Sequence, residues 1–182
     1  EDTSERIKGA VFGIYSDSDC TKLVEKLTTN ANGYAKSREL TIGTYYVKEI
    51  TAAPGYVVSA NKVKVVVKSD ETTRVDETNK EQLASITICK EGEVLAGWNG
   101  TNFTYLTQRI EGVTFKLTAG EDIYRADGTK AYSKGAVVKS NLKTGSDGKV
   151  VVNNLHLGTY VVTETKSVPG FTLNTTPKTI KI

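Results

Sequence analysis

Short segments in which apolar and polar residues alternate recur along the whole chain. Alternation with a period of two is typical of a β-strand with one buried face, and β-branched residues strengthen the pattern. Turn-forming pairs separate these segments, with Asp-Gly at 127–128 and 147–148 and Pro-Gly at 54–55 and 169–170. Short strands with regular turns predict an antiparallel β-sandwich. The clearest strand segments are 63–67 (VKVVV), 85–89 (SITIC), 112–117 (GVTFKL), 149–155 (KVVVNNL) and 159–164 (TYVVTE).

One segment fits this pattern less well. Residues 19–30 (DCTKLVEKLTTN) place Leu23 and Leu27 four positions apart, which is also the spacing of one helical turn. We expect either a hairpin or a short helix at this point.

Two parts of the chain repeat each other. Residues 43–56 (GTYYVKEITAAPGY) match residues 158–171 (GTYVVTETKSVPGF) at an offset of 115 positions. Residues 8–15 (KGAVFGIY) resemble residues 111–118 (EGVTFKLT) at an offset of 103 positions. Because two copies of one folding unit explain both matches, we predict tandem domains over residues 1–81 and 82–182.

Each repeat places a glutamate on the face of a strand that otherwise carries apolar residues. In the first copy Glu49 shares its parity with Tyr45 and Val47, and Glu164 holds the same place in the second copy. A carboxylate is costly to bury alone. Each glutamate therefore lies either at a solvated strand end or inside the sandwich. In the second case a chemical role has to account for the cost of burying the carboxylate.

Composition and charge exclude several classes of function. Apolar residues make up 38% and charged residues 25% of the chain, as in a soluble globular protein. The net charge is +3 with both signs interspersed, so a nucleic-acid partner is not expected. No apolar run is long enough to span a bilayer. The lone histidine, His156, and the distant Cys20 and Cys89 predict no metal site, no cofactor and no enzymatic cluster.

The repeated motifs resemble a known family. The spacing Tyr-x-x-x-Glu-x-x-x-x-Pro-Gly-aromatic in residues 45–56 and 160–171 is similar to the signature of Cna-B-type (SpaA-like) domains. Residues 9–17 (GAVFGIYSD) and 112–117 (GVTFKL) resemble that family's second strand. The resemblance implies an all-β fold of two tandem Ig-like, prealbumin-like antiparallel sandwiches. It also implies a stalk or pilin module of a Gram-positive surface protein, which is extracellular and anchored to the cell wall through segments outside this chain.

The resemblance further implies a cross-link inside each domain. Members of the family commonly join a lysine of the first strand to an asparagine of the last by an isopeptide bond, beside a buried acid. Glu49 and Glu164 match the acid, which favours their burial. Lys90, on the same face as Ile86 and Ile88, matches the lysine of the second domain, and Asn79 matches the asparagine of the first.

The partners of Lys90 and Asn79 do not occur at matching positions of this sequence. We therefore expect the first domain to lack its first strand and the second domain its last. Either the sequence is cut inside both domains, or another molecule supplies the two strands.

An aromatic segment at residues 97–106 (GWNGTNFTYL) offers a possible ligand surface. Trp98, Phe103 and Tyr105 form either a packed satellite cluster, which is the commoner situation, or an exposed patch. Three classes of function follow. A structural module would have neighbouring domains or pilus subunits as partners, an adhesin would bind a host matrix protein or glycan through the aromatic patch, and an enzyme would need a cluster that this sequence does not have.

Overall fold

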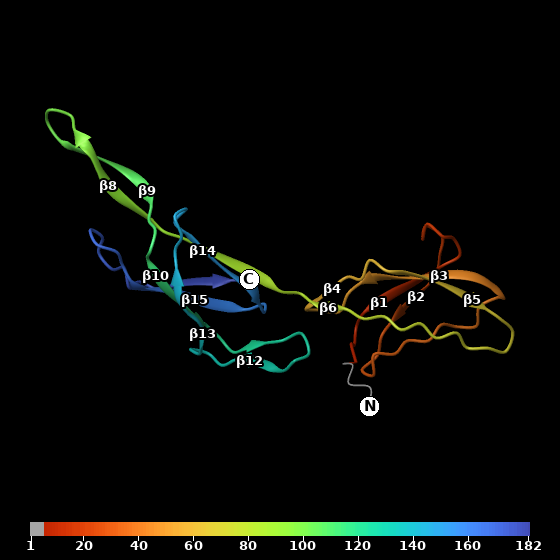
Figure 1. Cartoon of the computed structure of the whole chain (residues 1–182). Coiled ribbons are helices and arrows are strands. Elements are labelled where there is room, and N and C mark those ends of the chain that lie inside the picture. Colours follow the sequence, from red (N-terminus) through yellow and green to blue (C-terminus); the bar gives the residue numbers. More distant parts are fainter. Residues whose placement is uncertain (1–5) are drawn as a thin grey trace. The chain divides into compact units, whose positions relative to one another are not determined.

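The computed structural model describes residues 6–182, and the chain divides into two compact units, Glu1–Gln82 and Leu83–Ile182 (Figure 1). The described residues form strands, turns and irregular segments, with no helix among them. The strands of the first unit are β1 (Val11–Tyr15), β2 (Leu23–Thr28), β3 (Gly43–Thr51), β4 (Tyr56–Val57), β5 (Lys62–Val67) and β6 (Lys80–Glu81). Those of the second unit are β7 (Ala84–Cys89), β8 (Glu91–Trp98), β9 (Phe103–Arg109), β10 (Thr114–Ala119), β11 (Ile123–Tyr124), β12 (Lys130–Tyr132), β13 (Val137–Lys143), β14 (Lys149–Leu155), β15 (Thr159–Lys166) and β16 (Lys178–Lys181).

The first unit contains a four-stranded antiparallel sheet in the order β2-β1-β3-β5, and the short strands β4 and β6 pair separately. The helical alternative for residues 19–30 is wrong, because this segment continues from a loop into β2. The Asp17 carboxylate accepts hydrogen bonds from the backbone N–H groups of Thr21 and Lys22, at 3.1 and 2.7 Å. These bonds hold the loop, and β2 then pairs with β1 along its length.

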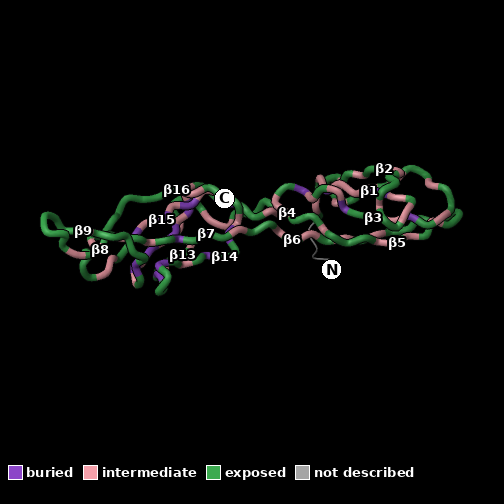
Figure 2. The backbone as a smooth tube through the Cα atoms, turned by 90° about the horizontal axis from the view of Figure 1, so that it is seen from above, coloured by how far each residue is buried: buried purple, intermediate pink, exposed green. Residues whose placement is uncertain are grey.

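The second unit contains the corresponding sheet in the order β13-β10-β15-β16 and a separate pair, β7 with β14. Side chains from both sheets form one continuous core (Figure 2 marks the buried segments in purple). Its buried members are Ile86, Ile88, Ile110, Val113, Phe115, Leu117, Ala119, Ile123, Val152, Leu155, Tyr160 and Val162.

Strand register shows that the sequence repeat is also a structural repeat. Phe12 lies opposite Glu49 in the first unit, and Phe115 lies opposite Glu164 in the second. In both units the register shifts immediately beside this pair, so that one extra residue follows the glutamate, Ile50 in β3 and Thr165 in β15. The two glutamates therefore occupy equivalent places in equivalent sheets.

The aromatic segment of the second unit forms the long hairpin β8–β9, which extends from the rest of that unit (Figure 1). Trp98, Phe103 and Tyr105 are 57%, 60% and 60% exposed, so the packed-cluster interpretation is wrong. A two-stranded hairpin has no second layer against which its side chains can be buried.

Candidate functional site

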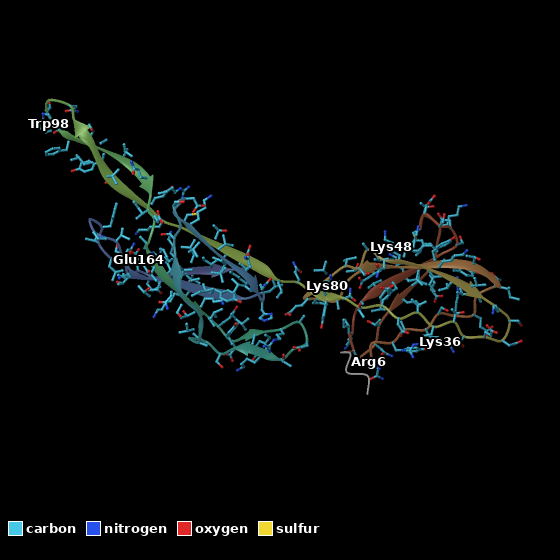
Figure 3. The ribbon with its side chains drawn as sticks, viewed as in Figure 1. Arg6, Lys36, Lys48, Lys80, Trp98 and Glu164 are labelled. Carbon is cyan, nitrogen blue, oxygen red and sulfur yellow. The ribbon has the colours of Figure 1, made fainter. Side chains whose placement is uncertain are left out.

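The site of the second unit is a buried ion pair between Lys90 and Glu164. The Lys90 Nζ donates a hydrogen bond of 2.9 Å to Glu164 Oε2. The Glu164 side chain is 3% exposed and that of Lys90 is 17% exposed. Figure 3 shows Glu164 among the side chains of this unit. The pair therefore lies at the margin of the core, with the acid inside and the amine nearer to water.

Strand alternation explains why Lys90 points inward. Ile86 and Ile88 are buried on the same face of β7, and Lys90 continues that face by one further step. Its backbone is held from two sides, because its N–H donates to the Gly148 carbonyl at 2.8 Å and its carbonyl accepts from Ile110 at 3.0 Å. The apolar stem of a lysine can cover a core margin while its amine reaches a polar partner.

The site of the first unit pairs the same acid with an amide. The Asn79 Nδ2 donates to Glu49 Oε2 at 2.7 Å and to the Val57 carbonyl at 3.0 Å, which uses both of its N–H groups. The backbone N–H of Ser59 donates to the same carboxylate oxygen at 2.5 Å. Glu49 is 3% exposed. These bonds direct the amide nitrogen of Asn79 toward the buried acid.

Asn79 reaches this position without being part of a strand. The resemblance places it on the last strand of the domain, but in this structure β6 begins one residue later, at Lys80, and pairs only with β4. The side-chain bonds of Asn79 and the β4–β6 pair hold the segment. Ser59 and the Val57 carbonyl contribute through backbone atoms, which leave no signal in the sequence.

Each glutamate has one carboxylate oxygen that accepts a hydrogen bond and one that has no partner. Glu49 Oε1 and Glu164 Oε1 are buried and have no hydrogen-bond partner among the described residues. A buried polar atom without a partner is uncommon and suggests a strain or a chemical role. Each carboxyl group thus has one oxygen bonded to a side-chain nitrogen and one oxygen that can accept a further hydrogen bond.

The two sites place equivalent glutamates beside different nitrogen groups. The second unit holds an acid and an amine, whereas the first holds an acid and an amide. Among residues 6–182 no ion pair joins a lysine to Glu49, and Glu164 has Lys90 as its salt-bridge partner. The described part of the chain has no group of three His, Cys, Asp or Glu side chains placed to bind a metal. Nor does it contain a helix long and apolar enough to cross a membrane.

The aromatic side chains lie together on one face of the β8–β9 hairpin. Leu95 lies opposite Tyr105, and Trp98 lies opposite Phe103 with ring centroids 5.0 Å apart. A register shift between Leu95 and Gly97 brings Trp98 to this face, since its parity would otherwise place it on the other. Figure 3 shows Trp98 near the tip of the hairpin.

Known proteins resemble this chain in sequence or in structure. Over 83 residues the chain is 40% identical to the trypsin-resistant surface T6 protein of Streptococcus pyogenes, a match that covers 40% of this chain and 15% of that protein. The Bacillus anthracis TIE protein matches the whole chain with 26% identity and a TM-score of 0.64, and the matched part is 29% of its length. The minor pilin GBS52 of Streptococcus agalactiae matches 96% of this chain and 77% of its own, with 19% identity and a TM-score of 0.35.

The family assignment follows from a sequence profile that matches twice. The profile of the SpaA prealbumin-like fold domain covers residues 1–81 and again residues 105–182. The two matched segments contain both glutamates at equivalent strand positions and leave out most of the β8–β9 hairpin. The chain therefore belongs to the SpaA prealbumin-like fold domain family, of which it carries two copies.

Proposed function

We propose that this chain is a structural module of a bacterial surface protein, of the stalk or pilin type. In the full-length protein a lysine–asparagine isopeptide bond locks each of its two sandwiches, with the partners of Lys90 and Asn79 supplied from outside this chain. The names of the T6 surface protein and the GBS52 pilin are consistent with such a role. Its partners are then neighbouring domains of the same protein or other pilus subunits, and its location is the outside of the cell.

The observation that carries the proposal is the pairing of each buried acid with one reacting group. Glu164 Oε2 lies 2.9 Å from the Lys90 amine, and Glu49 Oε2 lies 2.7 Å from the Asn79 amide nitrogen. A buried acid beside a lysine can take its proton, and a buried acid beside an amide can give a proton to the leaving nitrogen. The two units together display both halves of the arrangement that the reaction needs.

The reaction requires no external reagent. The neutral lysine Nζ attacks the Cγ of asparagine, a new C–N bond forms, and the bond from Cγ to Nδ2 breaks. The acid carries a proton from the amine to the departing nitrogen, which leaves as ammonia. Burial assists because a low-dielectric site favours the neutral forms of an amine and an acid that exchange a proton.

The test adds to each unit a copy of the segment of the other unit that carries the reacting group it lacks. A copy of residues 84–90 is added before the first unit, to offer a lysine to Asn79 and Glu49. A copy of residues 72–80 is added after the second unit, to offer an asparagine to Lys90 and Glu164. We expect the intact mass to fall by one ammonia for each bond, and peptide mapping to locate the two cross-links.

Matched variants separate chemistry from docking. Glu164→Ala should prevent the cross-link of the second unit and leave that of the first, and Glu49→Ala should do the reverse. Hydrogen exchange on the neighbouring sheets reports whether an added strand has docked. A docked strand that forms no cross-link, or cross-linking that continues with alanine in place of the acid, would contradict the proposed role of the glutamates.

A second function, as an adhesin module, is favoured by the exposed aromatic face of β8–β9. Leu95, Trp98, Phe103 and Tyr105 share that face, and aromatic side chains are enriched where proteins bind partners. The ligand would be a host matrix protein or glycan. A screen against immobilised matrix proteins and glycans, with Trp98→Ala and Phe103→Ala as comparison variants, tests it. Binding that does not change in either variant would exclude this face.

A further inference from the structure

The outer face of the four-stranded sheet of the first unit carries a cluster of lysines. Cross-strand partners share a face of a sheet, and the register aligns Lys26 of β2, Gly13 of β1, Lys48 of β3 and Lys62 of β5 in one row. Lys64 lies in the next row, opposite Tyr46. All four lysines are exposed. In Figure 3 Lys48 lies on the opposite side of this unit from Lys36.

Two tyrosine rings lie among these lysines. A side chain at Gly13 would begin within 2.5 to 2.8 Å of the Tyr15 ring atoms, so that ring lies over the glycine. It is therefore flanked by the strands that carry Lys26 and Lys48. Tyr46 lies beside Tyr15, and the Lys62 amine is 5.7 Å from the centre of the Tyr46 ring. The face thus combines cationic amines with flat apolar rings.

The positive charge of this face does not follow from the net charge of the whole unit. Residues 1–82 contain 12 Lys and Arg and 13 Asp and Glu, so this part of the chain is slightly acidic. Yet the outward positions of the four strands, which alternate with the buried ones, carry the four lysines and no carboxylate. The β1–β2 loop holds Asp17 and Asp19 nearby in sequence, but the Asp17 carboxylate is bonded within its own loop.

Like charges on adjacent strands oppose folding. Lys48 and Lys62 are direct cross-strand partners, and Lys64 lies one row away on the same strand as Lys62. Lys62 donates to the Ser18 carbonyl, which holds one amine at the end of the row without neutralising it. A bound anionic partner would remove the repulsion, since it places negative charge among the amines.

The second unit provides an internal comparison, because the outer face of its equivalent sheet carries lysines without aromatic rings: Lys143 and Lys166 lie on either side of Thr114, and Lys116 lies in the next row. By the offsets of the repeat, Lys48 corresponds to Thr163 and Tyr46 to Val161. Those two residues lie on β15, opposite Lys116 and Thr118 of β10. The fold therefore does not require aromatic rings on this face, and the two tyrosines among the lysines distinguish the first unit from the second.

We propose that this face of the first unit binds a linear sulfated polysaccharide. Lysine amines spaced across four strands, over about 14 Å at the usual strand separation, match a row of sulfate groups along a chain. The Tyr15 and Tyr46 rings offer apolar surfaces against which the C–H faces of sugar rings can pack. A duplex nucleic acid would use the charges but not the rings, so the combination favours the acidic sugar. The proposal does not depend on the isopeptide chemistry or on the aromatic hairpin.

The test measures binding of the full chain to heparin and, at matched salt, to a double-stranded DNA oligomer. The variant Lys48→Gln/Lys62→Gln/Lys64→Gln should bind heparin at least about tenfold more weakly, because charge provides the attraction. A matched control, Lys139→Gln/Lys149→Gln/Lys181→Gln, removes three exposed lysines from the second unit and should change the affinity less than about twofold. Tyr46→Val should weaken heparin binding about threefold or more.

Circular dichroism and hydrogen exchange on β3 check that each variant remains folded. Three results would overturn the proposal. These are equal losses in the two triple variants, no heparin binding by the unmodified chain at low salt, and DNA binding as tight as heparin binding. Heparin binding that depends on the first-unit lysines and on Tyr46, and exceeds DNA binding, supports it.

Discussion

Replacing Lys90 should destabilise the second unit more than replacing Glu164, although the two side chains form one buried pair. We compare Lys90→Met, Glu164→Gln and the double variant Lys90→Met/Glu164→Leu. Lys90→Met leaves the carboxylate of Glu164 in a nearly water-free site, since that side chain is 3% exposed. Glu164→Gln leaves an amine that is 17% exposed and can turn toward water.

The magnitudes follow from this difference in burial. Removing one partner of a buried ion pair typically costs about 3–5 kcal/mol. We expect Lys90→Met to fall in that range and Glu164→Gln to cost about 1–3 kcal/mol, since water can solvate the remaining amine and the glutamine oxygen can still accept its hydrogen bond. The double variant replaces the pair with apolar groups and should lose less than the sum of the two single changes, with a coupling of about 1–3 kcal/mol.

Hydrogen exchange followed by mass spectrometry measures these changes in the intact chain. Peptides from β15 report on the second unit, and peptides from β3 serve as the control because they belong to the first. A loss of about 3 kcal/mol corresponds to exchange roughly a hundredfold faster in β15, where exchange requires unfolding of the unit. Exchange in β3 should not change.

Two results would refute this reasoning. If Lys90→Met destabilises β15 no more than Glu164→Gln does, the burial difference does not control the cost. If the double variant loses as much as the two single variants combined, the two side chains do not stabilise each other and the pair is incidental.

Three further predictions concern other parts of the fold. Burial raises the pKa of Tyr160 to about 12 from 10.0, so the stability that it contributes is complete below pH 10 and should be lost as the pH rises through 12, which an alkaline absorbance titration with circular dichroism measures. Leu117→Ala should cost the second unit about 2–5 kcal/mol in chemical denaturation, because Leu117 is fully buried and its truncation leaves a cavity. Hydrogen bonds from the Thr21 hydroxyl and from backbone N–H groups lower the pKa of Asp17 to about 2 from 3.8. The β1–β2 loop should therefore keep its order above pH 3.8 and lose it as the pH falls through 2, with a carboxyl NMR titration midpoint near pH 2 and no such transition in Asp17→Ala.

The sequence alone determined the fold class and the inward direction of the principal polar residues. Alternation and turn residues predict the sandwiches, and the family match confirms them. Parity predicts that Glu49 and Glu164 share a face with buried tyrosines, and both glutamates are buried in the structure. These properties depend on neighbouring residues within one strand, and the period of two is the same wherever the strand is placed.

Tertiary structure decided what those residues meet. Neither the contact of Lys90 with Glu164 nor that of Asn79 with Glu49 follows from spacing, because the partners lie 74 and 30 residues apart with other strands between them. The aromatic face of β8–β9 depends on one register shift, which moves Trp98 to the side of Phe103. An extra residue in a ladder reverses the parity of everything beyond it, and a sequence does not mark where that residue lies.

The lysine-rich face of the first unit is the clearest example of a feature that the sequence alone does not reveal. Its members are dispersed over residues 26 to 64 and form no basic run, so charge patterning along the chain does not reveal them. Pairing of four strands brings them into adjacent rows on one side of a sheet. Local pattern determines which way a side chain points, whereas strand order and register determine its neighbours, because these are set by pairing between distant segments.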